Sequence, residues 1–271
     1  MKRILALATL IALMGQPTSA FAAELVVCQK HVGDCTHRSI AGAAAAARDG
    51  DTILLRAGIY EEAAVLIANR LTLRAEPGAH MRGAAVEGKA ALVVKGDDIL
   101  IEGLECSEIN VVNGNGACIR MEGRNLTLRR IYFHDSQEGI LVGWIGRAEK
   151  GRLLIEDSRF ERLGFGGRAH AIYVGTRNIT FEIRRSRVVA SKGQGHEIKS
   201  RAARTLIEGC VIASLEGADS RLVDVPNGGE VVIRNNLFQK GPNSQNPDLI
   251  AVGLERGKPG RSDHTVNSIL V

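Results

Sequence analysis

Short apolar strands recur along most of the chain at a nearly constant interval. One apolar position repeats at spacings of 24 to 28 residues and is filled by Leu73, Ile101, Leu128, Ile155, Ile183, Ile207 and Ile233. A regular period of this length indicates a repeat architecture, and it is too short and too rich in strands for βαβ units. Each period is therefore predicted to be one coil of a solenoid whose neighbouring coils hydrogen-bond at about 4.8 Å.

Two more columns support this alignment. Five residues after the repeated position the side chains are apolar: Cys106, Phe133, Phe160, Val188, Ile212 and Phe238. Three residues after it they become small or polar, as expected at a bend: Leu104, Ile131, Ser158, Ser186, Cys210 and Asn236. A further strand in each repeat is marked by Ile119, Ile140, Ile172, Ile198, Val223 and Ile250. Each coil is thus expected to contain at least two strands.

The first repeats are preceded by a predicted helix. Residues 39–51 begin with an N-cap candidate, Ser39, continue through good helix formers that include six alanines, and stop at Gly50. A strand with a glycine turn follows at 52–62. The combination resembles the opening of right-handed parallel β-helix proteins of the pectate-lyase type, in which a helix covers the first coil. We expect an all-β chain: a right-handed parallel β-helix of about eight coils with a short N-terminal capping helix.

The two ends of the chain carry separate signals. Lys2 and Arg3 precede an apolar run too short to span a bilayer, and Ala20 and Ala22 satisfy the small-residue rule for cleavage. Residues 1–22 are therefore predicted to be a signal peptide, and residues 23–271 one undivided β-helix domain. Residues 264–271 predict another strand, so either the natural chain continues beyond Val271 or a loop covers this edge.

Composition and charge limit the kinds of molecule that the protein is expected to bind. Only 4% of the residues are aromatic, whereas 31 are glycine, which suits a turn-rich repeat fold. Without the signal peptide the chain has 33 basic and 30 acidic residues. This mild excess does not argue for nucleic acid, but it suits an acidic polysaccharide. We expect a secreted or periplasmic monomer without a membrane span.

The five cysteines all follow the predicted cleavage site. In an oxidising compartment an odd number leaves one unpaired. Cys28 and Cys35 are close enough to join an N-terminal loop, and Cys106 and Cys118 can pair within one coil. Cys210 is then the expected free and buried thiol. No C-x-x-C motif and no Cys/His cluster in the sequence indicates zinc.

Polar residues gather on the second strand of three successive repeats. The runs are A-H-A-I-Y-V-G (169–175), G-Q-G-H-E-I-K-S-R (193–201) and S-R-L-V-D-V-P-N-G-G (220–229). If Ile198 points inward, alternation turns Glu197, Lys199 and Arg201 outward and places Tyr173 and Asp224 beside Lys199. The remaining candidates of this patch are His170, His196 and Arg221, at strand entrances where a bend leaves their direction open, and Asn227.

This set of side chains suits the cleavage of a uronate polysaccharide by β-elimination. The reaction needs a base for the proton next to the carboxylate, a cation for the carboxylate and an acid for the leaving oxygen. Nearby cations disfavour the charged form of Lys199, which would make it a better base. Arg221, Arg201 and His196 are then the neutralising or donating groups, and Tyr173, His170, Asp224 and Asn227 the substrate contacts.

The segment E-I-K-S at 197–200 resembles the lysine-bearing segment of the chondroitinase B and alginate lyase family, which are β-helix enzymes. The resemblance implies that Lys199 is the base, assisted by an arginine one coil on, and that Glu197 is a calcium ligand. The match covers residues 193–238. It departs from the family in a shorter spacing between Glu197 and Lys199, and in P-N-G-G at 226–229 where an R-H-G segment is expected. Arg221 is proposed by position.

Several competing interpretations stay open. His170 and His196 could cap backbone groups, Tyr173 could pack under a loop, and Lys199 could form an ordinary ion pair with Asp224. G-Q-G-H at 193–196 is similar to a polygalacturonase element, but that hydrolysis needs paired carboxylates, and the upstream coil has none. A uronate epimerase has the same need for a base and an acid. A non-catalytic protein that binds glycan or a cell surface is the alternative to an enzyme.

Overall fold

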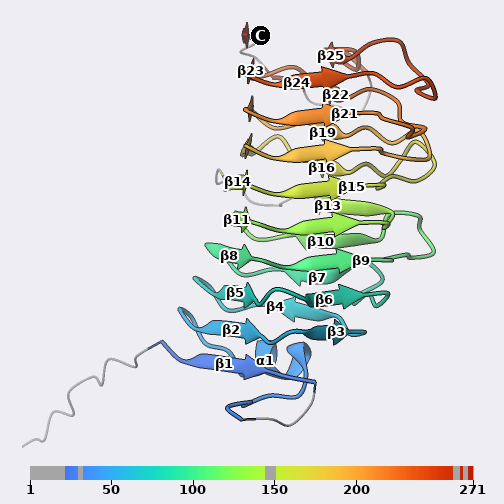
Figure 1. Ribbon diagram of the computed structural model, residues 1–271. Coiled ribbons are helices and arrows are strands. Elements are labelled where there is room, and N and C mark those ends of the chain that lie inside the picture. Colours follow the sequence, from blue (N-terminus) through green and yellow to red (C-terminus); the bar gives the residue numbers. More distant parts are fainter. Residues whose placement is uncertain (1–21, 30–32, 144–150, 259–262, 265–267, 271) are drawn as a thin grey trace, which may run out of the picture.

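The chain winds into a right-handed parallel β-helix in which each coil adds one strand to each of three sheets (Figure 1). The computed structural model describes residues 22–29, 33–143, 151–258, 263–264 and 268–270. The predicted all-β solenoid of about eight coils is confirmed, because two of the sheets have eight strands each and the third has ten. Residues 1–21 of the predicted signal peptide lie outside the described residues.

The sheets are called A, B and C in the order in which the chain visits them. Sheet A holds β1 (Glu24–Val27), β2 (Thr52–Leu55), β5 (Thr72–Ala75), β8 (Ile99–Glu102), β11 (Asn125–Arg129), β14 (Gly151–Glu156), β17 (Ile179–Arg184), β20 (Arg204–Glu208), β23 (Glu230–Arg234) and β26 (Ser268–Leu270). Sheet B holds β3 (Gly58–Tyr60), β6 (Ala79–Arg82), β9 (Glu105–Ser107), β12 (Tyr132–His134), β15 (Arg159–Glu161), β18 (Arg187–Val189), β21 (Val211–Ala213) and β24 (Leu237–Gln239). Sheet C holds β4 (Ala64–Leu66), β7 (Ala90–Val94), β10 (Ala117–Met121), β13 (Glu138–Val142), β16 (Ile172–Val174), β19 (Ile198–Ser200), β22 (Val223–Val225) and β25 (Ile250–Val252).

The three apolar columns predicted from the repeat match the pairing of residues between neighbouring strands in the three sheets. Every anchor from Leu73 to Ile233 is the direct partner of the next one in sheet A. The columns that start at Cys106 and Ile119 align in the same way in sheets B and C. The anchor side chains of sheet A are at most 2% exposed, so this column lies in the core that the three sheets enclose.

The residues at the bend between sheets A and B are also stacked from coil to coil. One residue of each turn has a left-handed backbone, as in Arg130 (φ 50°), Asp157 (φ 51°) and Arg185 (φ 47°). Where the next residue has a side-chain oxygen, that oxygen accepts a backbone N–H of the neighbouring coil: Ser158 N–H donates to Ser186 Oγ at 3.1 Å, and Cys210 N–H donates to Asn236 Oδ1 at 2.8 Å. The polar character predicted for this column is therefore a ladder of bonds to backbone groups.

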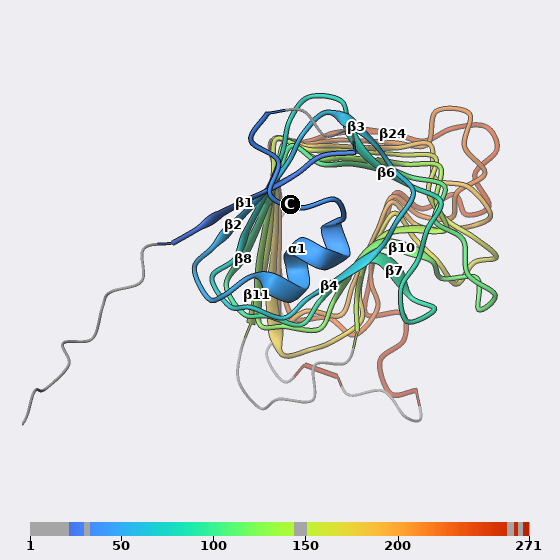
Figure 2. The same ribbon diagram turned by 90° about the horizontal axis from the view of Figure 1, so that it is seen from below.

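A short helix, α1 (Ile40–Ala46), lies inside the outline of the first coils and covers that end of the core (Figure 2). Ser39 is its N-cap as predicted, and its Oγ accepts the N–H of Gly42 at 3.0 Å. The helix ends before the predicted stop at Gly50. Ala47 is already extended, because the following turn is held by a bond from Arg48 N–H to Asp51 Oδ2 at 2.8 Å.

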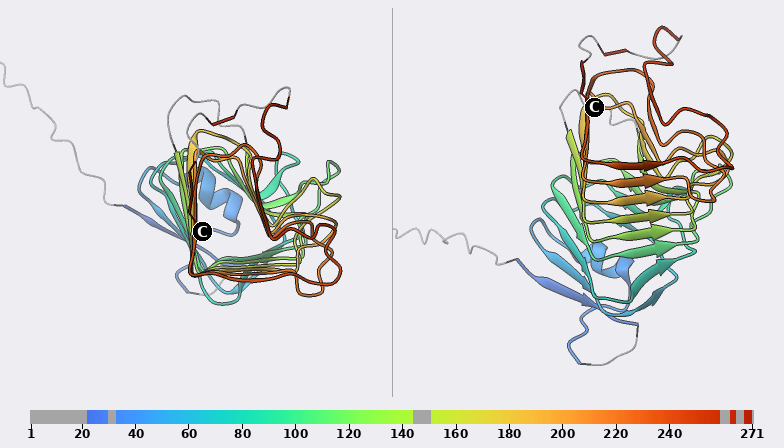
Figure 3. Two further views of the ribbon diagram at one scale, coloured as in Figure 1. Left: turned by 90° about the horizontal axis from the view of Figure 1, so that it is seen from above. Right: turned by 45° about the horizontal axis from the view of Figure 1, so that its top comes forward.

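The cysteine assignment is confirmed. Cys28 pairs with Cys35 and Cys106 pairs with Cys118, while Cys210 is a free and buried thiol. None of the helices among the described residues has the length and apolar character that a membrane crossing requires. The loops from sheet B to sheet C project from one side of the coil stack, beside the strands that carry the predicted patch (Figures 2 and 3).

Candidate active site on sheet C

The predicted stacking of the three polar runs is confirmed. Strands β16, β19 and β22 are neighbours, and Tyr173, Lys199 and Asp224 are partners in adjacent coils. Ile198 is fully buried in the core, so these three side chains lie on the outer face of sheet C. Alternation along a strand was sufficient to place them, because each sits within a regular strand.

Lys199 is held between two carboxylates. Its Nζ lies 3.3 Å from Asp224 Oδ2 and 3.5 Å from Glu255 Oε1, and its side chain is 13% exposed. The ion pair with Asp224 that the sequence left open is therefore present. It is not an ordinary surface pair, because Asp224 is buried and its Oδ1 has no hydrogen-bond partner among the described residues.

His196 turns toward Lys199, which resolves the direction that the sequence left open. Its Nε2 lies 3.4 Å from the same Asp224 Oδ2, while its Nδ1 accepts the backbone N–H of Arg221 at 3.0 Å. Burial lowers the pKa of His196 to about 4, so the imidazole is neutral at pH 7. With Nδ1 as an acceptor, the ring proton sits on Nε2 and points at Asp224.

The backbone-capping interpretation of the two histidines is also confirmed. His170 Nδ1 accepts the N–H of His196 at 3.0 Å, and Glu138 Oε1 accepts the N–H of His170 at 3.3 Å. Each side chain in this column thus binds the backbone of the next coil. His170 is 2% exposed, stacks on His196 at 4.9 Å and meets the ring of Tyr173 edge-on at 5.2 Å. It positions its neighbours and does not reach the surface as a predicted substrate contact would.

Arg201 and Asn227 form a second buried group. The guanidinium of Arg201 donates to Tyr173 Oη at 3.1 Å, to Glu255 Oε2 at 2.7 Å and to Asn227 Oδ1. Asn227 is 2% exposed, which does not fit its predicted role in contacting substrate. Tyr173 remains half-buried, and Arg201 fixes both its hydroxyl and the carboxylate of Glu255.

Glu197 is not on the outer face, which corrects the expectation from alternation. Its neighbours in register, Ala171 and Leu222, both belong to the hydrophobic core, because the chain bends at the strand entrance and turns this position inward. Glu197 is fully buried, its Oε1 accepts the N–H of Ser191 at 3.0 Å, and burial raises its pKa well above the usual value. A calcium ligand role for Glu197 beside Lys199 does not fit this position.

The outer-face residues line a hollow of about 530 Å³ beside strands β19 and β22. The side chains that carry charge or the imidazole there are His196, Lys199, Arg221, Asp224, Glu255 and Lys258. Arg221, predicted only by position, does line the hollow, and its guanidinium also pairs with Asp248 at 3.2 Å. The hollow therefore combines ammonium and guanidinium groups with two carboxylates and a neutral imidazole.

Two carboxylates that pair with cations of the site escaped the sequence interpretation. Asp248 lies two residues before Ile250, in the same column as His196 and Arg221, so the repeat alignment contained a signal for it. Glu255 follows β25 in a loop without any period, and no linear pattern could have linked it to Lys199. Burial works to raise the pKa of Glu255, but the bond from Arg201 and the charge of Lys199 outweigh it and lower that pKa.

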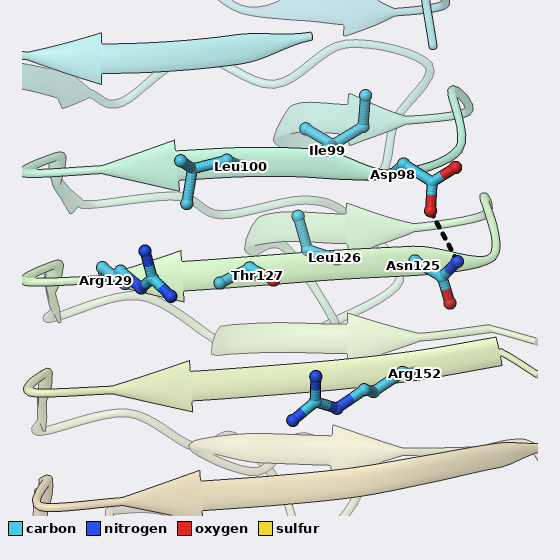
Figure 4. Close-up of a pocket in the computed structure, with 8 residues that line it drawn as sticks. All are labelled: Asp98, Ile99, Leu100, Asn125, Leu126, Thr127, Arg129 and Arg152. Atoms are coloured by element: carbon cyan, nitrogen blue, oxygen red, sulfur yellow. Dashed lines mark hydrogen bonds between the residues drawn. The ribbon is translucent and has the colours of Figure 1, made fainter. Parts of the chain in front are cut away.

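A second hollow, of about 420 Å³, lies on the outer face of sheet A (Figure 4). Its polar groups are separate: Asn125 Nδ2 donates to Asp98 Oδ1 at 2.7 Å, while Arg129 and Arg152 extend over different strands. Because its charged side chains do not converge on a common point, we place the candidate site on sheet C.

Comparison with known proteins supports the architecture. No known family model matches the chain, and no curated protein sequence matches it. Among solved structures, it is similar to the pectin methylesterase PemA from Erwinia chrysanthemi, with a TM-score of 0.55, 13% identity, and coverage of 93% of this chain and 94% of that one. A pectin methylesterase in complex with hexasaccharide VII has a TM-score of 0.54 and 13% identity, with coverage of 93% of this chain and 94% of that one. The pectin methylesterase from Aspergillus niger has a TM-score of 0.51 and 14% identity, with coverage of 94% of this chain and 93% of that one. At these identities the likeness shows the fold alone, which is a parallel β-helix.

Proposed function

We propose that the protein is an exported enzyme that acts on a uronate-containing polysaccharide in the hollow of sheet C, by β-elimination. The observation that carries the proposal is the contact of Glu255 with both Lys199 and Arg201. These two cations already bind a carboxylate, which is the group that a uronate presents. The hexasaccharide bound by a protein of the same fold and the two disulfides support a carbohydrate ligand and an oxidising compartment.

In this proposal the substrate carboxylate takes the place of Glu255. Arg201 and Arg221 neutralise it, which acidifies the adjacent C–H of the sugar. Neutral Lys199 is the base, and Asp224, whose Oδ2 lies 3.3 Å from Nζ, takes its proton beforehand. Nζ then removes the proton next to the carboxylate, a carbon–carbon double bond forms, the bond to the leaving oxygen breaks, and that oxygen takes a proton from water. His196 donates from Nε2 to Asp224 and holds that carboxylate in place.

Substitution of Lys199 by arginine tests its role as a base separately from its positive charge. Lys199→Arg keeps the cation but cannot act as a base, so formation of unsaturated uronate should fall by about 10²-fold or more, while oligosaccharide binding persists. The measurement is ultraviolet absorbance with alginate, pectate, chondroitin and dermatan as substrates, and the exposed Lys192→Arg is the control. A Lys199→Arg protein as active as the parent, or a parent that forms no unsaturated product from any substrate, would refute β-elimination by Lys199.

Ester hydrolysis is a second candidate, which the geometry of Asp224 favours. Its carboxylate is buried, two donors hold Oδ2, and Oδ1 has no hydrogen-bond partner among the described residues, as a base that accepts a proton from water requires. Proteins of the same fold are named pectin methylesterases. Release of methanol from methylated pectin without any new ultraviolet absorbance, lost in Asp224→Asn, would select this candidate. Binding of oligosaccharide without either product would indicate a glycan-binding protein.

Glycoside hydrolysis and calcium-assisted elimination fit the hollow less well. A glycoside hydrolase needs one protonated carboxyl group, whereas Lys199 contacts both Asp224 and Glu255 and Arg201 adds a second cation to Glu255. Calcium, implied by the lyase resemblance, would need oxygen ligands near Lys199. Glu197 faces the core, and both carboxylates of the hollow are bound by cations, so the residues present do not fit that ion.

A further inference from the structure

Two histidines and a glutamate meet on the outer face of sheet B, away from the hollow of sheet C. His80 on β6 and Glu105 on β9 are partners in register, and His134 on β12 lies one coil further along. One ligand atom from each of the three residues lies within 4.8 Å of the others. They are the one such cluster of three among the described residues, and they are 25 and 29 positions apart, so no linear motif reveals them.

The hydrogen bonds of His134 leave a lone pair facing a carboxylate. Its Nδ1 lies 2.7 Å from Asp135 Oδ2, and Asp135 is itself bound by Arg162 at 2.8 and 2.7 Å. A carboxylate only accepts, so Nδ1 carries a proton. In the neutral imidazole Nε2 then has a lone pair, directed at Glu105 Oε1 at 3.2 Å. Two acceptors at this distance need a cation between them, which is either a second ring proton or a metal ion.

The surroundings of the cluster are those of an oriented ligand set. Asp135 fixes the ring of His134, and Ser107 Oγ contacts His80 Nε2 at 2.8 Å, while His80 Nδ1 lies 3.8 Å from Glu105 Oε1. Carboxylate and hydroxyl partners of this kind orient metal-binding imidazoles. The ring of Tyr132 stacks on His134 at 4.3 Å and covers one side, whereas Glu105 is 34% exposed and keeps the other side accessible.

We propose that His80, Glu105 and His134 bind one divalent transition metal ion such as zinc. Two imidazoles and one carboxylate suit zinc, copper or nickel, whereas calcium and magnesium prefer oxygen ligands alone. Three protein ligands leave at least one position for water. Because the ligands come from three successive coils, the ion would tie these coils together on a face that the proposed enzymatic function does not use.

The test uses the mature chain without a histidine tag, stripped with a chelator and titrated with zinc chloride in a calorimeter. We expect one zinc ion per chain, and cobalt should give visible absorption bands at the same stoichiometry. Glu105→Gln, which keeps the side-chain shape, and His134→Ala should each weaken zinc binding by about 10-fold or more. His37→Ala, near the N-terminus, should bind as the parent does.

Two outcomes would overturn the proposal. One is zinc binding that is not stoichiometric or that survives unchanged in a folded Glu105→Gln protein, which would indicate adventitious binding elsewhere. The other is a chain that binds no zinc and whose His134 carries both ring protons in nuclear magnetic resonance spectra, which would establish an imidazolium pair with Glu105.

Discussion

Glu255 places a carboxylate of the protein where the proposed substrate would place its own. Replacing it by glutamine removes the charge that competes for Lys199 and Arg201 but keeps a side chain of similar size. We expect Glu255→Gln to bind a uronate oligosaccharide about fivefold more tightly, since a partly exposed ion pair is worth about 1 kcal/mol. Isothermal titration with oligogalacturonate measures the change.

The matched control is Glu24→Gln, which removes a carboxylate paired with Arg74 at 2.7 Å on sheet A. Its affinity for the oligosaccharide should equal that of the parent. Unchanged or weaker binding by Glu255→Gln would show that this carboxylate does not occupy the ligand position.

The buried carboxyl group of Glu197 makes the stability of the folded chain depend on pH. Burial, together with the nearby Asp219, raises its folded pKa well above the ordinary value of 4.5. The folded chain therefore holds this proton to higher pH than the unfolded chain, so the stability contributed is complete below about 4.5 and is lost as pH rises through the folded pKa. Glu197→Gln, a permanent neutral analogue, should lose less stability between pH 5 and pH 8, by about 1.4 kcal/mol per pH unit at most.

Urea unfolding at several pH values measures this difference. Glu216→Gln, in an exposed loop, is the control and should run parallel to the parent. Parallel curves for Glu197→Gln and the parent would mean that Glu197 ionises normally inside the folded chain.

At the scale of the elements, the bend between sheets A and B depends on side-chain oxygens. Ser186 Oγ accepts the N–H of Ser158 at 3.1 Å and donates to the carbonyl of Arg184 at 2.8 Å, and it is 4% exposed. Ser186→Ala leaves the buried N–H of Ser158 without this acceptor, so the free energy of unfolding should fall by about 1 to 3 kcal/mol.

The measurement is again urea unfolding, with Ser268→Ala on the exposed edge strand β26 as the control. Because the ladder joins neighbouring coils, the loss should be larger for Ser186 than for Ser268. Equal effects would mean that water replaces the serine at the bend.

The strand entrances of sheet C work by the same rule with different residues. Glu138, His170 and His196 each accept a backbone N–H from the next coil. In His196 this bond also determines the tautomer, because it leaves the ring proton on Nε2, the nitrogen that faces Asp224. The same hydrogen bond therefore caps the backbone of the next coil and orients His196 in the candidate site.

At the scale of the whole molecule, a β-helix is a one-dimensional stack whose coils contact their neighbours. Residues at the same position of successive coils become neighbours in space although they are 24 to 28 positions apart in sheet A. This is how His196 and Lys199 meet Asp224 on sheet C, and how His80 and Glu105 meet His134 on sheet B. One repeat can thus build separate polar clusters on separate faces.

The sequence alone determined the coil, the register and much of the patch. The apolar columns identify which residues are partners, because a slip by one position would expose them. Lys199, Tyr173 and Asp224 were therefore placed side by side correctly. Closeness along the chain, a separate argument, paired four of the five cysteines. The periodicity works here since burial repeats with every coil.

Only the tertiary structure decided what happens where the period breaks. A bend at the strand entrance turns Glu197 into the core and His196 toward Asp224, and alternation holds only within a strand. Glu255 reaches Lys199 from an aperiodic loop, so no column contains it. The hydrophobic effect acts on every coil and can be read along the chain, whereas the charges of the site were brought together by bends and loops whose paths depend on the folded neighbours.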